Sequence, residues 1–232
     1  MKYRSRKYKT TAEQQSYWPS FVDIMTTVCL VFFFIMIVSS GINKMFVDNI
    51  VDKREKLYDS IQAKLDANNV DKNLIVFDRK KGKIDIKTET FFDTDKSDLK
   101  QDGINVANTL SSIFYDLLSD PKIADEIQYI EVVGHTDYIG NTIDNRTLST
   151  SRANSFLNTM VPMNSALEND YGQKFKASGM SEFEVNQSKL ERDRTEYNDE
   201  EASKQRKIEI RMIFSNKDIE EAVKSRSKDN SQ

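Results

Sequence analysis

The segment "WPSFVDIMTTVCLVFFFIMIVSS", residues 18–40, constrains the fold most, because it is the only long apolar run in the sequence. As a helix, the stretch from Phe21 to Ile42 rises about 33 Å at 1.5 Å per residue. That length matches a hydrocarbon core about 30 Å thick. Trp18 fits the aromatic belt at a membrane surface. We therefore predict a transmembrane helix over residues 18–42.

The charge around this segment predicts its orientation. Residues 1–42 carry five basic and two acidic side chains, although the whole chain has a net charge of −3. Basic residues that precede an apolar segment mark the cytoplasmic side of a membrane. We expect residues 1–17 to be a basic cytoplasmic tail, with the bulk of the chain on the other side. A cleaved signal peptide with its apolar region at Val28–Val38 is the alternative, and Trp18 argues against it.

Composition excludes several classes of function. The chain has one Cys and one His, so it has neither a disulfide framework nor the ligands for a zinc cluster. Its net negative charge argues against binding to nucleic acid. With 31% charged residues, it is too polar to span a membrane many times. One anchored globular domain remains, with no cofactor expected.

One carboxylate, Asp23, lies inside the apolar run, about one helical turn from its cytoplasmic end. Asp has a short side chain that reaches the interface poorly, and an ionisable group inside a span is by default functional. Thr26 and Thr27 follow on the same face of a helix. Their hydroxyls can extend a polar stripe or bond back to helix carbonyls. Because one span cannot enclose an ion pathway, Asp23 implies a partner membrane protein.

Residues 43–70 have the pattern of an amphipathic helix that continues beyond the span. Their apolar side chains recur three to four residues apart, apart from one interruption at Arg54, and lie at Phe46, Ile50, Leu57, Ile61 and Leu65. Three roles fit this stripe. The helix packs on its own domain, pairs with a second copy in a parallel dimer seam, or forms a mobile plug beside the membrane.

The remaining sequence predicts one folded domain over residues 71–216 and a charged, disordered tail over 217–232. Alternating apolar residues indicate strands, and a 3.6-residue period indicates helices. The fold class is α/β, a sandwich with helices on one face of a small mixed sheet. The expected elements are a hairpin at 73–88, a helix at 101–118, a strand at 127–135, a helix capped by Ser149, a polar loop or short helix at 182–204, and strands at 173–179 and 205–214.

The stretch "VVGHTDYIGNTIDNRTLSTSRA" is the most informative part of this domain. It brings Asp137 and Arg152 to one edge of the sheet, since a strand ends there and a helix begins. A carboxylate beside a guanidinium can clamp a zwitterion or form a structural ion pair. The single histidine, His135, either supports this loop or senses pH. The stretch contains no nucleophile–base pair, so we expect a binding domain and not a hydrolase.

Residues 73–214 resemble the OmpA-like peptidoglycan-binding domain, whose pattern runs "G-x-T-D…N-x-x-L-S-x-x-R-A". The opening "FFDTDKSDLKQDG" and the closing "SKQRKIEIRM" are also similar to that family. The residues in register are Gly134, Thr136, Asp137, Asn145, Leu148, Ser149, Arg152 and Ala153.

The resemblance implies a peptidoglycan site. In the family, the residues that match Asp137 and Arg152 hold the diaminopimelate of the peptide stem. Thr136, Asn145 and Arg206 are implied as further contacts. The chain departs from the family beside the last of these, where Gln205 replaces the usual Asn.

The span resembles the B subunit of MotA/MotB-type ion-driven motors, whose segment runs "Y-A-D-x-M-T-x-x-x-x-F-F". Asp23 matches the ion-carrying aspartate of that family. The resemblance implies a homodimer inside five copies of a MotA-like subunit in the cell inner membrane, with the C-terminal domain in the periplasm. The transported ion is H⁺ or Na⁺.

Within that superfamily, "EEASKQRKIEIRMIF" and the polar insert before it look more like ZorB, the B subunit of Zorya anti-phage defence systems. That resemblance implies a ZorA-like partner. A flagellar MotB-like subunit and a non-motor cell-wall anchor remain as alternatives. Asp23 speaks against the plain anchor, which has no reason to keep an acid in the membrane.

Overall fold

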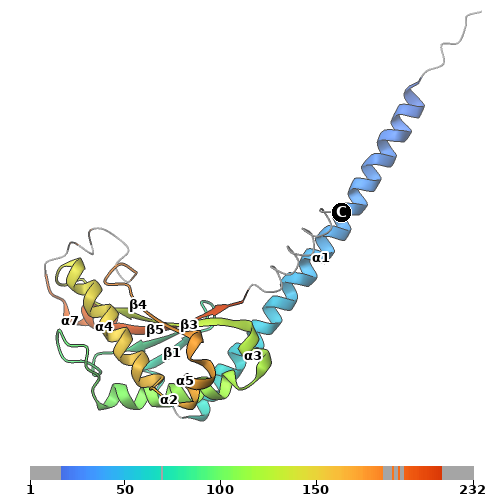
Figure 1. The fold of residues 1–232 in the computed structure, drawn as a ribbon. Coiled ribbons are helices and arrows are strands. Elements are labelled where there is room, and N and C mark those ends of the chain that lie inside the picture. Colours follow the sequence, from blue (N-terminus) through green and yellow to red (C-terminus); the bar gives the residue numbers. More distant parts are fainter. Residues whose placement is uncertain (1–16, 69, 185–189, 191–192, 194–195, 216–232) are drawn as a thin grey trace, which may run out of the picture. The chain divides into compact units, whose positions relative to one another are not determined.

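The computed structural model describes residues 17–68, 70–184, 190, 193 and 196–215 (Figure 1). The chain divides into two compact units, Met1–Arg54 and Glu55–Gln232. Nearly all of the expected basic tail and the whole charged C-terminal tail lie outside the described residues.

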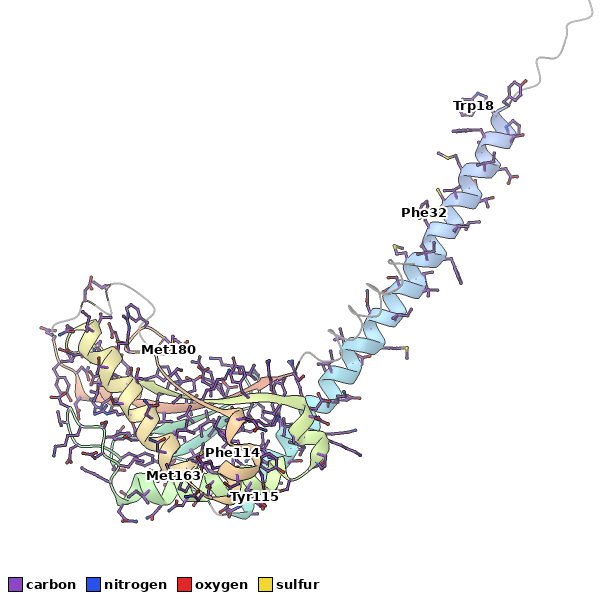
Figure 2. All side chains as sticks on the ribbon, in the orientation of Figure 1. Trp18, Phe32, Phe114, Tyr115, Met163 and Met180 are labelled. Carbon is purple, nitrogen blue, oxygen red and sulfur yellow. The ribbon has the colours of Figure 1, made fainter. Side chains whose placement is uncertain are left out.

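The first unit is built on helix α1 (Trp18–Ala67), which continues into the second unit. Within the described residues, α1 is the one helix long and apolar enough to cross a membrane, judged by length and composition. Its apolar side chains point outward: Leu30 is 63% exposed, Phe32 66% and Phe34 67% (Figure 2). Without a lipid or protein surface around them, these side chains would remain in water.

The last turns of α1 belong to the folded domain. Leu57, Ile61 and Leu65 are 4%, 0% and 5% exposed and join the domain's hydrophobic core. Of the three roles considered for residues 43–70, packing on the chain's own domain therefore describes this stretch. A dimer seam through these three side chains is wrong, because they are already buried. The domain accordingly begins near Glu55 and not at residue 71.

The domain contains one five-stranded sheet in the order β1-β2-β5-β3-β4. Only the β3–β4 pair is parallel among the strands of this sheet. This arrangement confirms the predicted hairpin and the predicted mixed sheet. The strands are β1 (Ile75–Asp78), β2 (Lys83–Lys87), β3 (Ile127–His135), β4 (Phe175–Gly179) and β5 (Lys207–Phe214).

The main helices cover one face of the sheet, as the fold class predicted (Figure 1). Phe114 shows the packing: it is 1% exposed and meets Phe175 of β4 edge to face, with ring centroids 6.2 Å apart (Figure 2). The helices are α2 (Gln101–Leu118), α3 (Pro121–Glu126), α4 (Thr142–Met160), α5 (Ala166–Tyr171), the 3₁₀ turn η1 (Gly172–Lys174) and α7 (Asp199–Gln205).

Helix α4 begins earlier than the sequence suggested. Ser149 was the expected cap, but it lies inside the helix and its hydroxyl donates to Arg146 O at 3.0 Å. Asn141 caps the helix instead, because its side chain accepts a hydrogen bond from the Asp144 N–H at 2.9 Å. The loop between β3 and α4 is therefore short.

Candidate functional site

The topology brings four segments to one edge of the sheet. Strand β3 ends there at His135, and its antiparallel neighbour β5 begins there at Lys207, since these two residues pair in register. The parallel strand β4 ends at the same edge, because Gly179 pairs with Gly134. The segments that follow β2, β3 and β4, and the helix that precedes β5, therefore meet around the β3–α4 loop.

Asp137 lies at the centre of this loop and is paired with Arg206. Its Oδ2 accepts a hydrogen bond from Arg206 Nη1 at 2.8 Å, and its Oδ1 accepts one from the Ile139 N–H at 3.1 Å. The two charged side chains are 17% and 24% exposed, so the pair is partly shielded but still reachable. Arg206 Nη2 also lies 3.5 Å from Asp199 Oδ1. One guanidinium therefore links the loop to helix α7.

Burial lowers the pKa of the Arg206 guanidinium, but the hydrogen bonds to Asp137 and Tyr197 outweigh that effect and raise it overall. Arg206 is therefore a permanent cation beside a carboxylate. Such charge-assisted bonds are the stronger class of hydrogen bond.

Arg152 of helix α4 is 7% exposed and does not bond to Asp137 in the structure. Its Nε donates to Lys96 O at 2.9 Å and its Nη2 donates to Asp93 O at 3.3 Å. Its guanidinium carbon lies 5.0 Å from the centre of the Phe92 ring. Arg152 thus secures the segment between β2 and α2, and the direct Asp137–Arg152 ion pair considered from the sequence is replaced by Asp137–Arg206.

Arg152 still interacts electrostatically with the charged groups of the same site. Burial lowers the pKa of its guanidinium, and the charge of Asp137 opposes that effect while the charge of Arg206 adds to it. Two guanidinium groups therefore influence one loop. In such an arrangement the Asp137 carboxylate can attract an ammonium group of a ligand, and the two guanidinium groups can attract a ligand carboxylate.

Asn145 and Gln205 brace the loop from two sides. The Asn145 side-chain amide donates to Ile139 O at 2.9 Å and to Asp137 O at 3.4 Å. Gln205 Oε1 accepts the Tyr138 N–H at 3.1 Å. The departure from the family at Gln205 therefore keeps a contact to the loop, and the 6% exposed Asn145 holds backbone instead of facing solvent.

Thr136 and His135 lead into the loop and are both buried, at 2% and 1% exposure. The Thr136 hydroxyl has no hydrogen-bond partner in the described part of the chain. His135 Nε2 lies 3.0 Å from Glu209 Oε2, but within that same part neither ring nitrogen makes a well-aligned hydrogen bond. The histidine is the last residue of β3 and leads directly into the loop.

Glu209 is the centre of a charged network on the sheet face that is not covered by the main helices. It is 2% exposed, and its carboxylate lies 2.7 Å from Lys83 Nζ, 3.1 Å from Arg211 Nε and 3.4 Å from Lys207 Nζ. Burial raises the pKa of Glu209, but the close approach of His135 and the ion pairs with Arg211 and Lys83 outweigh burial and lower it strongly. The carboxylate is therefore charged and neutralised inside the domain.

A metal ion does not suit this network. Ligand atoms of His135, Glu184 and Glu209 lie within 4.8 Å of one another. Both carboxylates are already bonded to Arg211, and Glu209 also contacts Lys83. A cation would have to displace these positive groups.

In the first unit, Asp23 is exposed on α1. The Thr26 hydroxyl donates to Val22 O at 2.7 Å, and the Thr27 hydroxyl donates to Asp23 O at 2.9 Å. Of the two roles considered for these threonines, the structure shows the bond back to the helix. Their hydroxyl oxygens keep lone pairs that can accept a further bond.

Three contributors to the site were missed from the sequence. Glu209 had a weak signal, since it alternates with apolar residues in "KIEIRM" and so must face away from the core. Gln205 was noted only as a departure from the family. Glu182, a buried carboxylate beside the loop, carried no local signal because it follows the sheet within a polar stretch.

No protein-family model matches this chain, and no curated protein matches it. Several solved structures do match it. A MotB-like protein from Desulfovibrio vulgaris aligns with a TM-score of 0.53 and 18% identity over 72% of this chain and 98% of that chain. The fold of the second unit is therefore that of MotB-like domains.

Two further structures are similar at lower scores. The cell wall anchor of the T6SS from Pseudomonas aeruginosa aligns at 17% identity over 67% of this chain and 97% of that chain, with a TM-score of 0.46. The periplasmic domain of Helicobacter pylori MotB aligns at 15% identity over 63% and 85%, with a TM-score of 0.46.

Proposed function

We propose that this chain is a membrane-tethered subunit that binds peptidoglycan and serves as the fixed part of an ion-driven motor. The observation that carries the wall-binding part is the partly exposed Asp137–Arg206 pair at the sheet edge, with the Arg152 charge beside it. The MotB-like fold supports the same conclusion. The protein is proposed to bind its ligand without chemical conversion.

The ligand is proposed to be the zwitterionic end of a peptidoglycan stem peptide. Asp137 would receive the ammonium group, and Arg206 would turn from Asp137 to the ligand carboxylate. Arg152 supplies further positive charge, since its guanidinium stays protonated while Nε and Nη2 donate to backbone carbonyls. Asn145 contributes by holding the loop carbonyls, and Thr136 contributes through its backbone N–H, which donates to Ser181 O; neither side chain is exposed.

The motor part of the proposal rests on Asp23. A carboxylate on an apolar helix with no bonded side chain in the described part of the chain needs a polar surface from another protein. We propose that a MotA-like subunit, or a ZorA-like one, supplies it and that Asp23 carries H⁺ or Na⁺ across the inner membrane. A charge that crosses 100 mV releases about 2.3 kcal/mol.

Two copies are proposed to stand side by side within a ring of five partner subunits. The seam cannot use Leu57, Ile61 or Leu65, which are buried in the domain. Exposed apolar positions earlier on α1, such as Met45 and Val51, are free for it.

The motor is proposed to be a Zorya-type defence complex. The supporting features are the closing segment "EEASKQRKIEIRMIF" and the polar insert that precedes it, which ends in α7. A flagellar stator is the second candidate, supported by the MotB-like fold.

The wall-binding part is tested by competition. The full chain in detergent should sediment with purified sacculi, and a soluble stem peptide that ends in a diamino acid should release it. A stem peptide whose side-chain amine is acetylated is the matched control and should release much less, because Asp137 would lose its ammonium partner. Equal release by both peptides would contradict the proposed recognition.

A further inference from the structure

Glu182 is a buried carboxylate that follows β4 and faces only neutral donors in the described part of the chain. It is 4% exposed. Its Oε1 accepts the Thr142 hydroxyl at 2.8 Å, and its Oε2 accepts the Asn145 amide at 3.4 Å and the Ser181 hydroxyl. A buried charge is costly unless its hydrogen bonds are satisfied, so these contacts constrain all the groups involved.

The Asn145 amide connects Glu182 to the Asp137 loop. The same Nδ2 group that points at Glu182 also donates to Ile139 O and Asp137 O. A carboxylate repels the amide oxygen and attracts the amide N–H groups. Glu182 therefore determines that the NH₂ end of the Asn145 amide faces the loop. In that orientation the amide donates to the carbonyl oxygens of Asp137 and Ile139 and holds the loop backbone in place.

The segment that carries Glu182 is itself held tightly. The Ser181 N–H donates to Ser149 Oγ at 3.1 Å, and the Thr136 N–H donates to Ser181 O at 3.1 Å. Gly134 permits this close packing, since a Cβ there would lie 2.0 Å from Ser149 O. Strand β3, helix α4 and the Glu182 segment therefore meet without room for rearrangement.

Electrostatics agree with a charged Glu182. Burial raises the pKa of its carboxyl group, but the hydrogen bonds from Ser181 and Thr142 outweigh burial and lower it. Thr142 is the first residue of α4, and the positive end of a helix dipole favours a carboxylate.

We propose that Glu182 is a positioning residue for the wall site: its charge orients Asn145 and the start of α4, and these hold Asp137 in its binding geometry. The inference rests on the proposed function, because it assigns Glu182 a part in peptidoglycan binding. Glu182 itself does not touch the ligand.

A double-mutant cycle tests the inference. Binding of the full chain to sacculi is measured for wild type, Glu182→Gln, Asp137→Ala and the double variant. Glu182→Gln replaces one carboxylate oxygen, which accepts hydrogen bonds, with an amide NH₂ group, which cannot accept them. At least one of the donors that now bond to Glu182 would lose its acceptor, so we expect about tenfold weaker binding in the wild-type background. In the Asp137→Ala background the same change should matter less than about twofold. An equal loss in both backgrounds would overturn the inference.

A second readout separates positioning from general damage. Hydrogen exchange of the Ile139 amide, which bonds to Asp137 Oδ1, should accelerate in Glu182→Gln while exchange in the sheet stays slow. Glu168→Gln is the matched control, because Glu168 on α5 also accepts from a neutral donor, the Asn164 N–H. This control should leave both binding and Ile139 exchange unchanged.

Thr142→Val is the milder variant if Glu182→Gln does not fold. It removes one donor to Glu182 and should shift binding and Ile139 exchange in the same direction, by a smaller amount. Unchanged exchange in folded variants would overturn the positioning role. If Asp137→Ala binds sacculi normally, the proposed wall function fails, and the exchange measurement still decides whether Glu182 orders the loop.

Discussion

The two units of this chain each present a carboxylate of functional interest, and the two carboxylates differ in what surrounds them. Asp137 is bonded to Arg206 and Ile139 within its own domain. Asp23 is exposed on an apolar helix, and no side chain in the described part of the chain bonds to its carboxylate. Under the proposed function, the wall site would be complete in one chain, whereas the membrane site would need a partner.

Hydrophobic burial shows the same contrast. In the domain, Ile61 and Phe114 are 0% and 1% exposed, so its core is satisfied internally. On the apolar part of α1, Phe32 and Phe34 are each about two thirds exposed. Buried apolar area contributes roughly 25 cal/mol per Å², and the described part of the chain supplies no such burial for these two side chains.

The largest expected effect is at Asp23. Asp23→Asn should abolish motor-dependent activity, measured in the native host as phage protection or motility, because the amide cannot exchange an ion. Protein level, membrane insertion and the melting temperature of the domain should not change. Asp48→Asn, an exposed acid on the same helix, is the control and should stay active. Normal activity of Asp23→Asn would rule out the motor.

The next effect concerns the boundary between the units. Ile61→Ala should destabilise the domain by about 4 kcal/mol, because a fully buried side chain leaves a cavity. Val51→Ala, at a side chain that is 48% exposed, should change little. Chemical denaturation of the full chain in detergent measures both. If both variants changed the free energy of unfolding by the same small amount, the last turns of α1 would not be part of the domain.

The charged network predicts a pH dependence. Glu209 has a lowered pKa in the folded domain, so its stabilising contribution is present above the ordinary carboxyl value of 4.5 and is lost as pH falls below it. Glu209→Gln should cost about 3 kcal/mol at neutral pH and less in acid. Thermal melts between pH 3 and 7 measure this, with the exposed Glu200→Gln as control. Parallel melting curves for wild type and Glu209→Gln across that range would contradict it.

The smallest effect is expected for Arg206→Lys. Lysine keeps the charge but loses the planar fork that reaches both Asp137 and Asp199. Sacculus affinity should fall about fivefold, which corresponds to about 1 kcal/mol. Lys204→Ala on the exposed side of α7 should leave affinity unchanged. A loss as large as that of Asp137→Ala would contradict this expectation and mean that binding depends on the planar fork of Arg206 and not mainly on its charge.

The sequence predicted the parts of the fold that have strong periodicity. The bounds of the helix at 101–118 and the strand at 127–135 agree with the structure. It misplaced the start of α4, because Ser149 and Asn141 are equally good cap residues and only the tertiary fold selects between them. It left the role of residues 55–67 open, since an apolar stripe looks alike whether it meets its own domain or a second copy.

At the site, the strand–loop–helix order correctly brought Asp137 and Arg152 to one region and the family resemblance added Arg206, but neither predicted which guanidinium bonds to the carboxylate. That choice depends on side-chain reach: Arg152 is bonded to backbone carbonyls of the segment after β2, and Arg206 points to Asp137. Glu182 was missed because its partners come from elements far apart in the sequence.

The most direct test of the contrast between the two units uses the full chain purified alone in detergent, without any partner subunit. Its binding to purified sacculi is measured for wild type, Asp137→Ala and Asp23→Asn. The account predicts saturable binding by the lone chain, about tenfold weaker binding for Asp137→Ala at an unchanged melting temperature, and wild-type binding for Asp23→Asn. No binding without a partner, or equal binding by wild type and Asp137→Ala, would contradict a wall site that is complete in one chain.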